Sequence, residues 1–449
     1  MGRLFGTDGA RGIANTELTC ELAMAIGRAA ATVLTRHTSH RPKIVIGWDT
    51  RISSQMLQSA LSAGICSVGA DALLLGMVPT PAVAYLVGRY GADAGVMISA
   101  SHNPVEFNGI KLFDRRGYKL PDSIEEEIET LILDMPETVE LKEGISLGRI
   151  LNSQTAAADY ITHLTDTVQG DLCGMKIAVD CANGSASATA AELFKKLGAE
   201  IVLLHAEPDG TNINQACGST HMESLMQYVR EHSCDAGVAF DGDADRCLAV
   251  DEKGNLVDGD QIMAIFAHCL QKQGLLAKDT LVATVMSNIG LFKFAEENGI
   301  HIVKTKVGDR YVLEEMLAFG YILGGEQSGH IIFGNYASTG DGQLSAIQLL
   351  SILKNSGLRF SELASMMTVY PQYMENVRVC NEKKQDWDND PEIRKAIASA
   401  EQMLGENGRI LVRASGTEPL IRVMAEGKEL GQITLLVQDI VRTVQKRLC

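Results

Sequence analysis

The sequence predicts an α/β protein: three similar α/β domains with mixed sheets, plus a smaller C-terminal α+β domain, around a central cleft. Short apolar segments alternate with segments of helical periodicity, and this alternation restarts twice after polar stretches. Strands interleaved with helices are typical of sheets that helices cover on both faces. The order of elements changes near the C-terminus. The expected domains are residues 1–155, 156–256, 257–368 and 369–449.

The first domain begins with a glycine-dense loop over residues 5–12, and its remaining elements alternate. We expect helices over 17–34, 55–69, 82–89 and 121–135, and strands over 43–47, 71–75 and 94–98. Pro104 and the Asn108-Gly109 pair predict a turn after the last of these strands. A polar stretch over 136–155 ends the domain.

The later domains follow from the same patterns. The second has expected strands over 176–179, 201–204, 236–240 and 247–250, and helices over 188–197 and 222–231. The third has strands over 280–285, 301–305 and near 322, and helices over 261–272, 291–298, 311–319 and 342–355. The fourth has strands over 375–379, 408–413 and 421–426, and helices over 391–404 and 433–448.

The composition limits the class of partner. Forty basic against fifty-six acidic side chains leave a net charge of −16, which argues against binding to nucleic acid. A phosphorylated small molecule needs only a local cluster of Arg, Lys and backbone N–H groups. The sequence has neither a membrane-spanning apolar run nor a signal peptide. Its ten scattered cysteines, without a C-x-x-C pair, predict reduced thiols in a cytoplasmic protein.

The strongest single motif is the acidic loop, residues 241–245, which reads Asp-Gly-Asp-Ala-Asp between two predicted strands. Its carboxylates would repel one another unless a hard cation neutralised them. Mg²⁺ suits a site of few carboxylates that a phosphate oxygen completes, and Arg246 would add a donor to that phosphate. A calcium loop is the alternative, with Glu252 at its twelfth position. Arg246 at the sixth position, where glycine is required, argues against it.

A second motif, residues 99–104, reads Ser-Ala-Ser-His-Asn-Pro. The G-x-S-x-G pattern of a hydrolase is absent. Neighbouring side chains of an extended chain point apart, so His102 is expected to be a poor base for Ser101. A phosphorylated serine instead needs cationic groups, a metal and a positioned base, which Lys111 and the acidic loop would supply.

Three further loops carry polar side chains that suit a sugar phosphate. Glu326 and Ser328, two apart in a glycine-flanked loop, suit the vicinal hydroxyls of a sugar, while nearby His330 is either a core residue or a proton carrier. Residues 413–419 with Arg422 have the composition of a phosphate cradle, the alternative being a hairpin turn. Arg11, among three glycines, offers a fork of donors to phosphate, unless the segment is an ordinary surface turn.

Together these motifs resemble the α-D-phosphohexomutase superfamily over nearly the whole chain and in the family's order. Residues 99–104 match its phosphoserine loop, 241–245 its magnesium loop, 325–330 its sugar loop and 413–419 its phosphate loop. Gln327 and the Gly-Thr-Asp-Gly-x-Arg-Gly opening look like the glucosamine branch. The phosphomannomutase/phosphoglucomutase branch usually has Met in place of Gln327.

The resemblance implies a role for each matched residue. It makes Ser101 the phosphorylated residue, and it makes Arg11, Lys111 and His330 assistants in proton transfer. The implied catalytic residues are Ser101, Lys111, Arg11, His102, His330 and Arg246, with His102 shaping the site. The implied ligands of one Mg²⁺ are Ser101, Asp241, Asp243 and Asp245. The implied substrate-binding residues are Glu326, Ser328, Arg413, Ser415, Gly416, Thr417 and Arg422.

The resemblance also implies an activity. A phosphoserine enzyme of the glucosamine branch would interconvert glucosamine 6-phosphate and glucosamine 1-phosphate and so supply UDP-N-acetylglucosamine synthesis. Glucosamine or glucose 1,6-bisphosphate would serve as intermediate or activator. The expected state is a monomer or homodimer that binds no nucleic acid and no membrane. The alternatives are a phosphomannomutase/phosphoglucomutase and a non-catalytic protein that binds calcium or a sugar phosphate.

Overall fold

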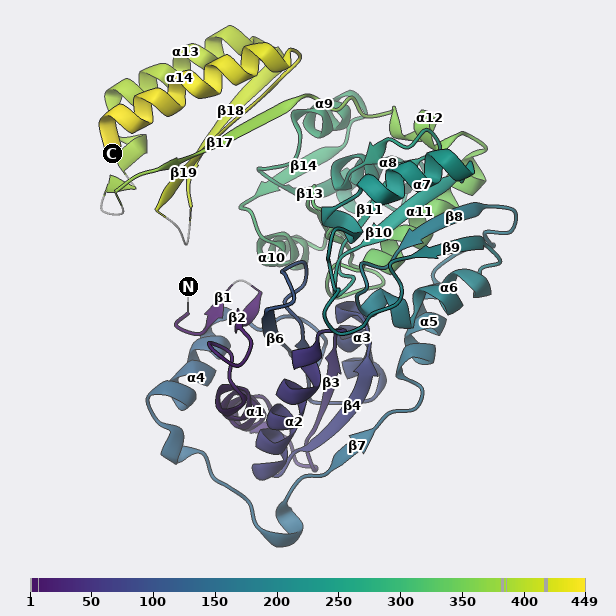
Figure 1. Cartoon of the computed structure of the whole chain (residues 1–449), viewed down its shortest axis with the longest axis vertical. Helices are drawn as coiled ribbons and strands as arrows, with labels where there is room; N and C mark the ends of the chain where they lie inside the picture. The colour runs from purple at the N-terminus through teal and green to yellow at the C-terminus, as the bar shows by residue number, and fades with distance from the viewer. Residues whose placement is uncertain (1, 7, 381–382, 385, 416–418, 449) are drawn as a thin grey trace. The chain divides into compact units, whose positions relative to one another are not determined.

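A computed structural model describes residues 2–6, 8–380, 383–384, 386–415 and 419–448. The chain forms two compact units. The larger unit comprises Met1–Met286 and Ile300–Met366, and the smaller comprises Ser287–Gly299 and Met367–Cys449. The larger unit contains three sheets and the smaller contains one (Figure 1).

The first sheet has the strand order β1-β2-β6-β5-β3-β4-β7. Its strands are β1 (Phe5–Gly6), β2 (Gly9–Ile13), β3 (Lys43–Trp48), β4 (Asp71–Met77), β5 (Ala94–Ile98), β6 (Phe107–Phe113) and β7 (Ile150–Asn152). Strand β3 pairs in parallel with β4 and β5, whereas β6 is antiparallel to β5 and β2. The predicted helices are confirmed as α1 (Cys20–Thr35), α2 (Ile52–Ser67), α3 (Thr80–Arg89) and α4 (Asp122–Leu133).

Two predictions for this sheet are wrong. Residues 5–6 and 9–12 lie in the strands β1 and β2 rather than in a loop, and Asn108-Gly109 lies inside β6 rather than in a turn. A Cβ on Gly109 would lie 2.5 Å from the Ser99 carbonyl oxygen, so this glycine permits close approach of strands. The polar stretch over 136–155, which is predicted to end the domain, also contains the unpredicted strand β7, which pairs in parallel with β4.

The second sheet has the order β12-β11-β10-β8-β9. Its strands are β8 (Lys176–Asp180), β9 (Glu200–Leu204), β10 (Ala236–Phe240), β11 (Cys247–Asp251) and β12 (Leu256–Val257). Its helices are α6 (Ala190–Lys196) and α7 (Glu223–His232), and the unpredicted α5 (Ala156–Asp166) precedes them. Strands β10 and β11 pair antiparallel from Ala236↔Asp251 to Phe240↔Cys247. The acidic loop therefore joins two strands, as predicted.

The third sheet has the order β14-β13-β15-β16. Its strands are β13 (Thr280–Thr284), β14 (His301–Thr305), β15 (Leu323–Gly325) and the unpredicted β16 (Ile331–Phe333). The helices of the larger unit that accompany this sheet in the chain are α8 (Gly259–Lys272), α10 (Asp309–Phe319), α11 (Gly342–Ser356) and α12 (Phe360–Ala364). Strands β15 and β16 form a hairpin, and the predicted sugar loop lies at its tip.

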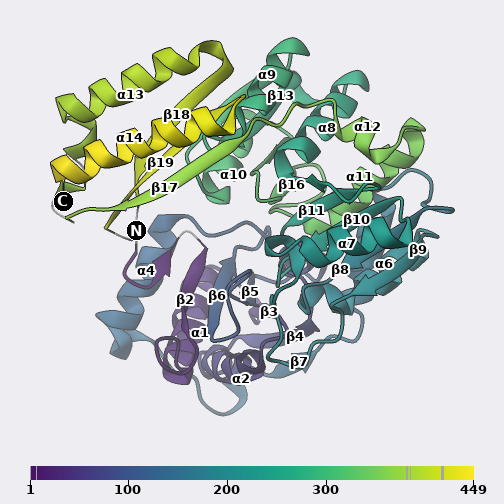
Figure 2. The same cartoon turned by 45° about the horizontal axis from the view of Figure 1, so that its top comes forward.

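The smaller unit is the predicted α+β unit, to which α9 (Ile289–Glu297) also belongs. Its antiparallel sheet has the order β17-β19-β18, from β17 (Gln372–Arg378), β18 (Gly408–Ala414) and β19 (Leu420–Gly427). Helices α13 (Pro391–Leu404) and α14 (Leu430–Leu448) lie side by side against this sheet (Figure 2). Buried aliphatic residues of both layers, including Val423 and Val437, form its core.

Two further expectations concern membranes and thiols. Among the described residues, no helix has both the length and the apolar character that crossing a bilayer requires. The nine cysteines in the described part of the chain are free thiols. Cys217 and Cys247 are fully buried, which agrees with their expected role in packing.

Candidate active site

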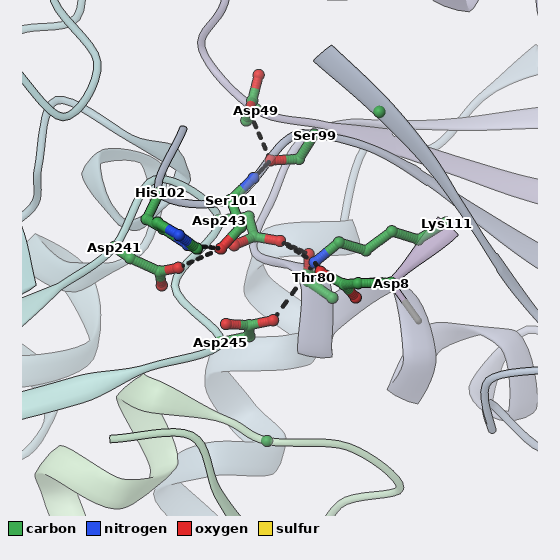
Figure 3. A network of polar contacts seen from close by, with 12 residues as sticks. Asp8, Asp49, Thr80, Ser99, Ser101, His102, Lys111, Asp241, Asp243 and Asp245 are labelled. Atoms are coloured by element: carbon green, nitrogen blue, oxygen red, sulfur yellow. Dashed lines mark hydrogen bonds and ion pairs between the residues drawn. The ribbon is translucent and has the colours of Figure 1, made fainter. Parts of the chain in front are cut away.

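Ser101 lies in the turn that follows β5 and is 1% exposed. Its φ of +52° places the residue in the left-handed region. The backbone N–H of Ser101 donates to Ser99 Oγ at 3.0 Å. Its hydroxyl donates to Asp241 Oδ2 at 2.6 Å (Figure 3). The turn therefore directs the serine hydroxyl at the acidic loop of the second sheet.

His102 does contact Ser101, contrary to the sequence prediction. Its Nδ1 lies 3.3 Å from Ser101 Oγ, because the chain turns at Ser101 instead of continuing extended. Arg246 Nη1 lies 3.1 Å from the same Nδ1, and a guanidinium only donates. Burial and the charge of Arg246 lower the pKa of His102 to about 4. His102 is thus a neutral imidazole whose Nδ1 accepts from Arg246, and the serine proton is bound by Asp241 instead.

The acidic loop gathers its three carboxylates in one buried place. Asp241, Asp243 and Asp245 are each at most 3% exposed, and an oxygen of each lies within 4.8 Å of the others. Thr80 Oγ1 donates to Asp243 Oδ2. Oδ1 of Asp243 and Oδ1 of Asp245 are buried and accept no hydrogen bond from the described residues. Buried carboxylates gathered so closely, with oxygens left without a hydrogen bond, are the donor set of a hard divalent cation.

The charges around this loop shift the pKa values of Asp241 and Asp245 in opposite directions. Burial and the charges of Asp245 and Asp243 raise the pKa of Asp241. Burial acts on Asp245 in the same direction, but the charges of Lys111 and His330 outweigh it and hold its pKa well below the usual range. Three carboxylates so close do not all ionise easily without added positive charge. The loop fits Mg²⁺, which would be held by the three aspartates and Ser101.

The calcium-loop alternative is wrong. Glu252 accepts hydrogen bonds from the backbone N–H of Ser361 at 2.9 Å and from its hydroxyl at 2.6 Å. The flanking segments are strands rather than helices. The carboxylate that a calcium loop needs at its twelfth position is therefore used to fix α12.

Lys111 is the cation closest to the acidic loop. It projects from β6, is 1% exposed, and its Nζ lies 2.8 Å from Asp243 and 3.4 Å from Asp245. Asp8 lies 3.2 Å from the same Nζ and also pairs with Arg11. Burial lowers the pKa of Lys111, but the surrounding carboxylates raise it well above its usual value. Lys111 is thus a fixed ammonium group.

The ion-pair network continues through residues that sequence reasoning missed. Lys119 Nζ lies 2.6 Å from Asp8 and 2.5 Å from Asp309, joining the first sheet to α10. Asp8 belongs to the Gly-Thr-Asp-Gly motif near the start of the chain, so the sequence could have indicated this residue. Lys119, Asp309 and Thr80 belong to no recognised motif.

His330 belongs to this network and is not an ordinary core residue. Its Nδ1 lies 3.6 Å from Asp245 and its Nε2 lies 3.4 Å from Asp309. The Gly340 N–H donates to Nε2 at 3.1 Å. Burial lowers the pKa of His330, but Asp245 and Asp309 raise it above the usual value overall. The side chain is therefore suited to hold a proton.

The loop of Glu326, Gln327 and Ser328 is hydrogen-bonded to the second sheet and to the N-termini of two helices, α10 and α8. The Cys247 N–H of β11 donates to the Gly329 carbonyl at 3.0 Å, which brings this loop beside the acidic loop. Glu326 accepts from the Gly308 N–H at 3.0 Å, while Ser328 is exposed. Gln327 Nε2 donates to Asp258 Oδ2 at 3.0 Å, so this amide fastens the loop to the N-terminus of α8.

The smaller unit carries the predicted phosphate loop. Arg413 of β18 pairs directly with Arg422 of β19. Burial and then the charge of Arg422 lower the pKa of Arg413. Ser415 is buried, with its N–H on the Leu420 carbonyl at 2.8 Å. Like charges directly opposite on paired strands are unfavourable without an anion. Gly416 and Thr417, also predicted here, lie outside the described residues.

Four family models match the chain in succession. They are phosphoglucomutase/phosphomannomutase domains I, II and III, over residues 2–138, 158–254 and 258–370, and the C-terminal domain over 374–443. The chain belongs to the phosphoglucomutase/phosphomannomutase family. It is accordingly an enzyme of the phosphohexomutase class, an isomerase that moves a phosphoryl group within a sugar phosphate.

Within this family the chain is similar to curated phosphoglucosamine mutases. It is 55% identical to that of Acetivibrio thermocellus over 448 residues and 56% identical to that of Clostridium acetobutylicum over 447, with both chains covered completely. Two solved structures share the fold. A phosphoglucomutase/phosphomannomutase family protein from Burkholderia thailandensis matches with TM-score 0.83, 23% identity and 99% and 98% coverage. Aspergillus fumigatus N-acetylphosphoglucosamine mutase, solved with GlcNAc-6P and magnesium, matches with a TM-score of 0.71 and 19% identity. The match covers 99% of this chain and 96% of that one.

Removal of the metal tests the acidic loop directly. We expect chelation by EDTA to abolish turnover and added Mg²⁺ to restore it, since the buried carboxylates need a cation before an anionic phosphate approaches. Calorimetric titration should give one Mg²⁺ per chain, and Asp243→Asn should weaken that binding by about tenfold or more. Asp439→Asn, on the exposed face of α14, is the control. Unchanged Mg²⁺ affinity in Asp243→Asn would contradict the assignment.

Proposed function

We propose that the chain interconverts glucosamine 6-phosphate and glucosamine 1-phosphate, with Ser101 as the phosphoryl carrier. The observation that carries this proposal is the 54–56% full-length identity to phosphoglucosamine mutases. The buried Ser101 hydroxyl, bonded to Asp241 beside two further carboxylates and Lys111, supports the carrier role. The product would feed UDP-N-acetylglucosamine synthesis in the cytoplasm.

The reaction consists of two transfers in opposite directions. In the first, the bond between Ser101 Oγ and phosphorus breaks, and a bond from phosphorus to O1 of glucosamine 6-phosphate forms. The O1 proton is transferred to Ser101 Oγ, which becomes a hydroxyl. The resulting 1,6-bisphosphate turns within the site. In the second, the bond between O6 and phosphorus breaks and the phosphoryl group bonds to Ser101 Oγ. The serine proton is transferred to O6, and glucosamine 1-phosphate departs. Free 1,6-bisphosphate, of glucosamine or glucose, would act as the activator that phosphorylates an unmodified serine.

The residues around Ser101 suit these steps. Mg²⁺ held by Asp241, Asp243, Asp245 and Ser101 would neutralise charge on the phosphoryl oxygens. Lys111 and Arg11 would supply fixed positive charge, since Lys111 Nζ lies 2.8 Å from Asp243 and Arg11 pairs with Asp8. His330 would hold a proton on Nδ1, which faces Asp245, because its Nε2 accepts from the Gly340 N–H. Arg246 orients neutral His102, and both shape the wall next to Ser101 Oγ.

Substrate contacts are proposed for the two remaining loops. Glu326 and Ser328 would bind sugar hydroxyls. Arg413, Ser415, Gly416, Thr417 and Arg422 would bind the phosphate that is not being transferred, an assignment supported by the opposed arginines. The chain would work as four domains, 1–155, 156–256, 257–368 and 369–449, in a monomer or homodimer. The ranges of the four family models support this division.

Turnover of three substrates tests the proposal. We expect kcat/KM for glucosamine 6-phosphate to exceed that for glucose 6-phosphate and mannose 6-phosphate by about tenfold or more, because a site that pairs the C2 amine leaves polar groups unsatisfied with the others. Equal or better turnover of glucose or mannose 6-phosphate would favour the phosphomannomutase/phosphoglucomutase alternative. No turnover of any of the three would overturn the mutase assignment.

A further inference from the structure

Two side chains from different sheets hydrogen-bond to the backbone of the turn that carries Ser101, and neither contacts the serine hydroxyl. Arg51 follows β3 of the first sheet, and Asn214 lies in the segment after β9 of the second sheet. Both donate to the carbonyl oxygen of Ser101: Arg51 Nη2 at 3.0 Å and Asn214 Nδ2 at 2.9 Å. Both also donate to the carbonyl of Asn103, at 2.8 Å and 3.1 Å. Two sheets therefore hold the same two oxygens.

The Arg51 half of this arrangement is completely buried. Its Nε donates to Asp49 Oδ2 at 2.9 Å, and neither side chain is exposed to solvent. The same Asp49 oxygen accepts from Ser99 Oγ at 2.6 Å, and Ser99 Oγ in turn accepts the Ser101 N–H (Figure 3). A buried charge with all its hydrogen bonds made is strongly fixed in position. Arg51 thus defines where the turn begins and ends.

The Asn214 half combines a left-handed backbone conformation with one unsatisfied acceptor. Asn214 has a φ of +59°, and its N–H donates to the Ala182 carbonyl at 2.9 Å. Both neighbours of its amide are carbonyl oxygens, which only accept, so the NH₂ group must face them. Its Oδ1 is buried without a hydrogen bond from the described residues. An unsatisfied buried acceptor costs about 1–3 kcal/mol, which marks the double donation as the contact that fixes this side chain.

The space around these contacts leaves little room for movement. A Cβ on Gly242 of the acidic loop would lie 2.5 Å from the Ser101 carbonyl oxygen and 2.8 Å from Asn214 Nδ2. Thr50 Oγ1 also donates to the Asn183 carbonyl at 2.7 Å, which links the first sheet to the second near the hydrogen bonds made by Arg51 and Asn214. The serine turn, the acidic loop and Asn214 are therefore closely packed around the Ser101 carbonyl oxygen.

We propose that Arg51 and Asn214 are positioning residues of the phosphoryl transfer, which hold Ser101 Oγ in register with the acidic loop from two different sheets. They bind carbonyl oxygens and not Oγ, so the same hydrogen bonds can form whether or not Oγ carries a phosphoryl group. A displacement of about 1 Å in such a site costs on the order of 10²-fold in rate. The inference rests on the proposed function, because it concerns the rate of that transfer.

The decisive variant is Asn214→Asp. Aspartate has the same shape and tolerates a positive φ, but it replaces the donating NH₂ with an oxygen that faces two carbonyls. We expect kcat for glucosamine 6-phosphate to fall by about tenfold or more while KM stays within about twofold. The matched control is Asn212→Asp, which removes an amide donation to the Glu207 carbonyl at 3.0 Å in the same segment without touching the serine turn.

The outcomes separate the inference from the function on which it rests. An inactive wild-type chain would overturn the proposed function itself. An active wild type with kcat of Asn214→Asp within about twofold of Asn212→Asp would overturn the positioning role alone. A rise in KM with unchanged kcat would also overturn it, because that pattern belongs to substrate binding. Should Asn214→Asp not fold, Asn214→Gly, which can keep the backbone conformation and removes the whole side chain with its donor, is judged by the same criteria.

Discussion

Replacing Ser101 with alanine is expected to lower turnover by a factor on the order of 10³ or more, because it removes the oxygen that carries the phosphoryl group. The fold should persist, since the hydroxyl makes one hydrogen bond to Asp241 and its loss costs about 1 kcal/mol. Steady-state turnover with glucosamine 6-phosphate and a thermal unfolding curve measure the two effects.

Intact mass spectrometry gives a second readout for this variant. Wild-type protein incubated with a hexose 1,6-bisphosphate should gain about 80 Da, one phosphoryl group, and lose it to phosphatase, whereas Ser101→Ala should gain nothing. Ser59→Ala, at an exposed position of α2, is the control. Turnover of Ser101→Ala within about tenfold of the control, or a phosphoryl group still attached to the variant, would contradict the carrier role.

Replacing Lys111 with methionine is expected to impair stability and activity together. The change leaves Asp8, Asp243 and Asp245 without the ammonium that lies within 3.4 Å of each. Breaking a buried ion pair from one side costs about 3–5 kcal/mol, and the loss of one fixed charge near a transferring group costs roughly 10²-fold in kcat. Urea unfolding and steady-state kinetics measure these losses.

The same variant should respond to metal more strongly than wild type. Carboxylates freed from Lys111 attract Mg²⁺, so added Mg²⁺ should recover a larger part of the lost stability in Lys111→Met than it adds to wild type. Lys195→Met, at an exposed site of α6, removes an equal charge away from the network and serves as the control. A free energy of unfolding equal to that of the control would show that Lys111 does not balance the buried carboxylates.

Much of the architecture was predictable because apolar strands and amphipathic helices have distinct periods. Strands β3, β10 and β11 and helix α13 lie where the pattern predicts them. The two wrong predictions in the first sheet have a common cause. β2 and β6 contain glycines and short polar residues with low strand propensity, and pairing with each other and with β5 makes them strands. An Asn-Gly pair read locally predicts a turn, but tertiary pairing overrides it.

The site was predictable where a motif concentrates charge and not where distant residues converge. Asp241, Asp243 and Asp245 are legible as a cation site from their spacing alone. The contact between His102 and Ser101 was not predicted, because the left-handed turn at Ser101 cannot be read from the sequence. Asn214 and Lys119 lie 113 and 190 residues from the Ser101 and Asp309 that they respectively contact, so no local pattern relates them.

The strand order of the first sheet bears on how the protein emerges during synthesis. Its two edges are β1 and β7, the first and the last strands of the segment to be translated. At ribosomal rates of roughly 5–20 residues per second, β4 waits on the order of ten seconds or less for β7, with its edge unpaired. The nascent chain therefore has a defined interval in which another strand could add at that edge, and chaperone protection would matter most then.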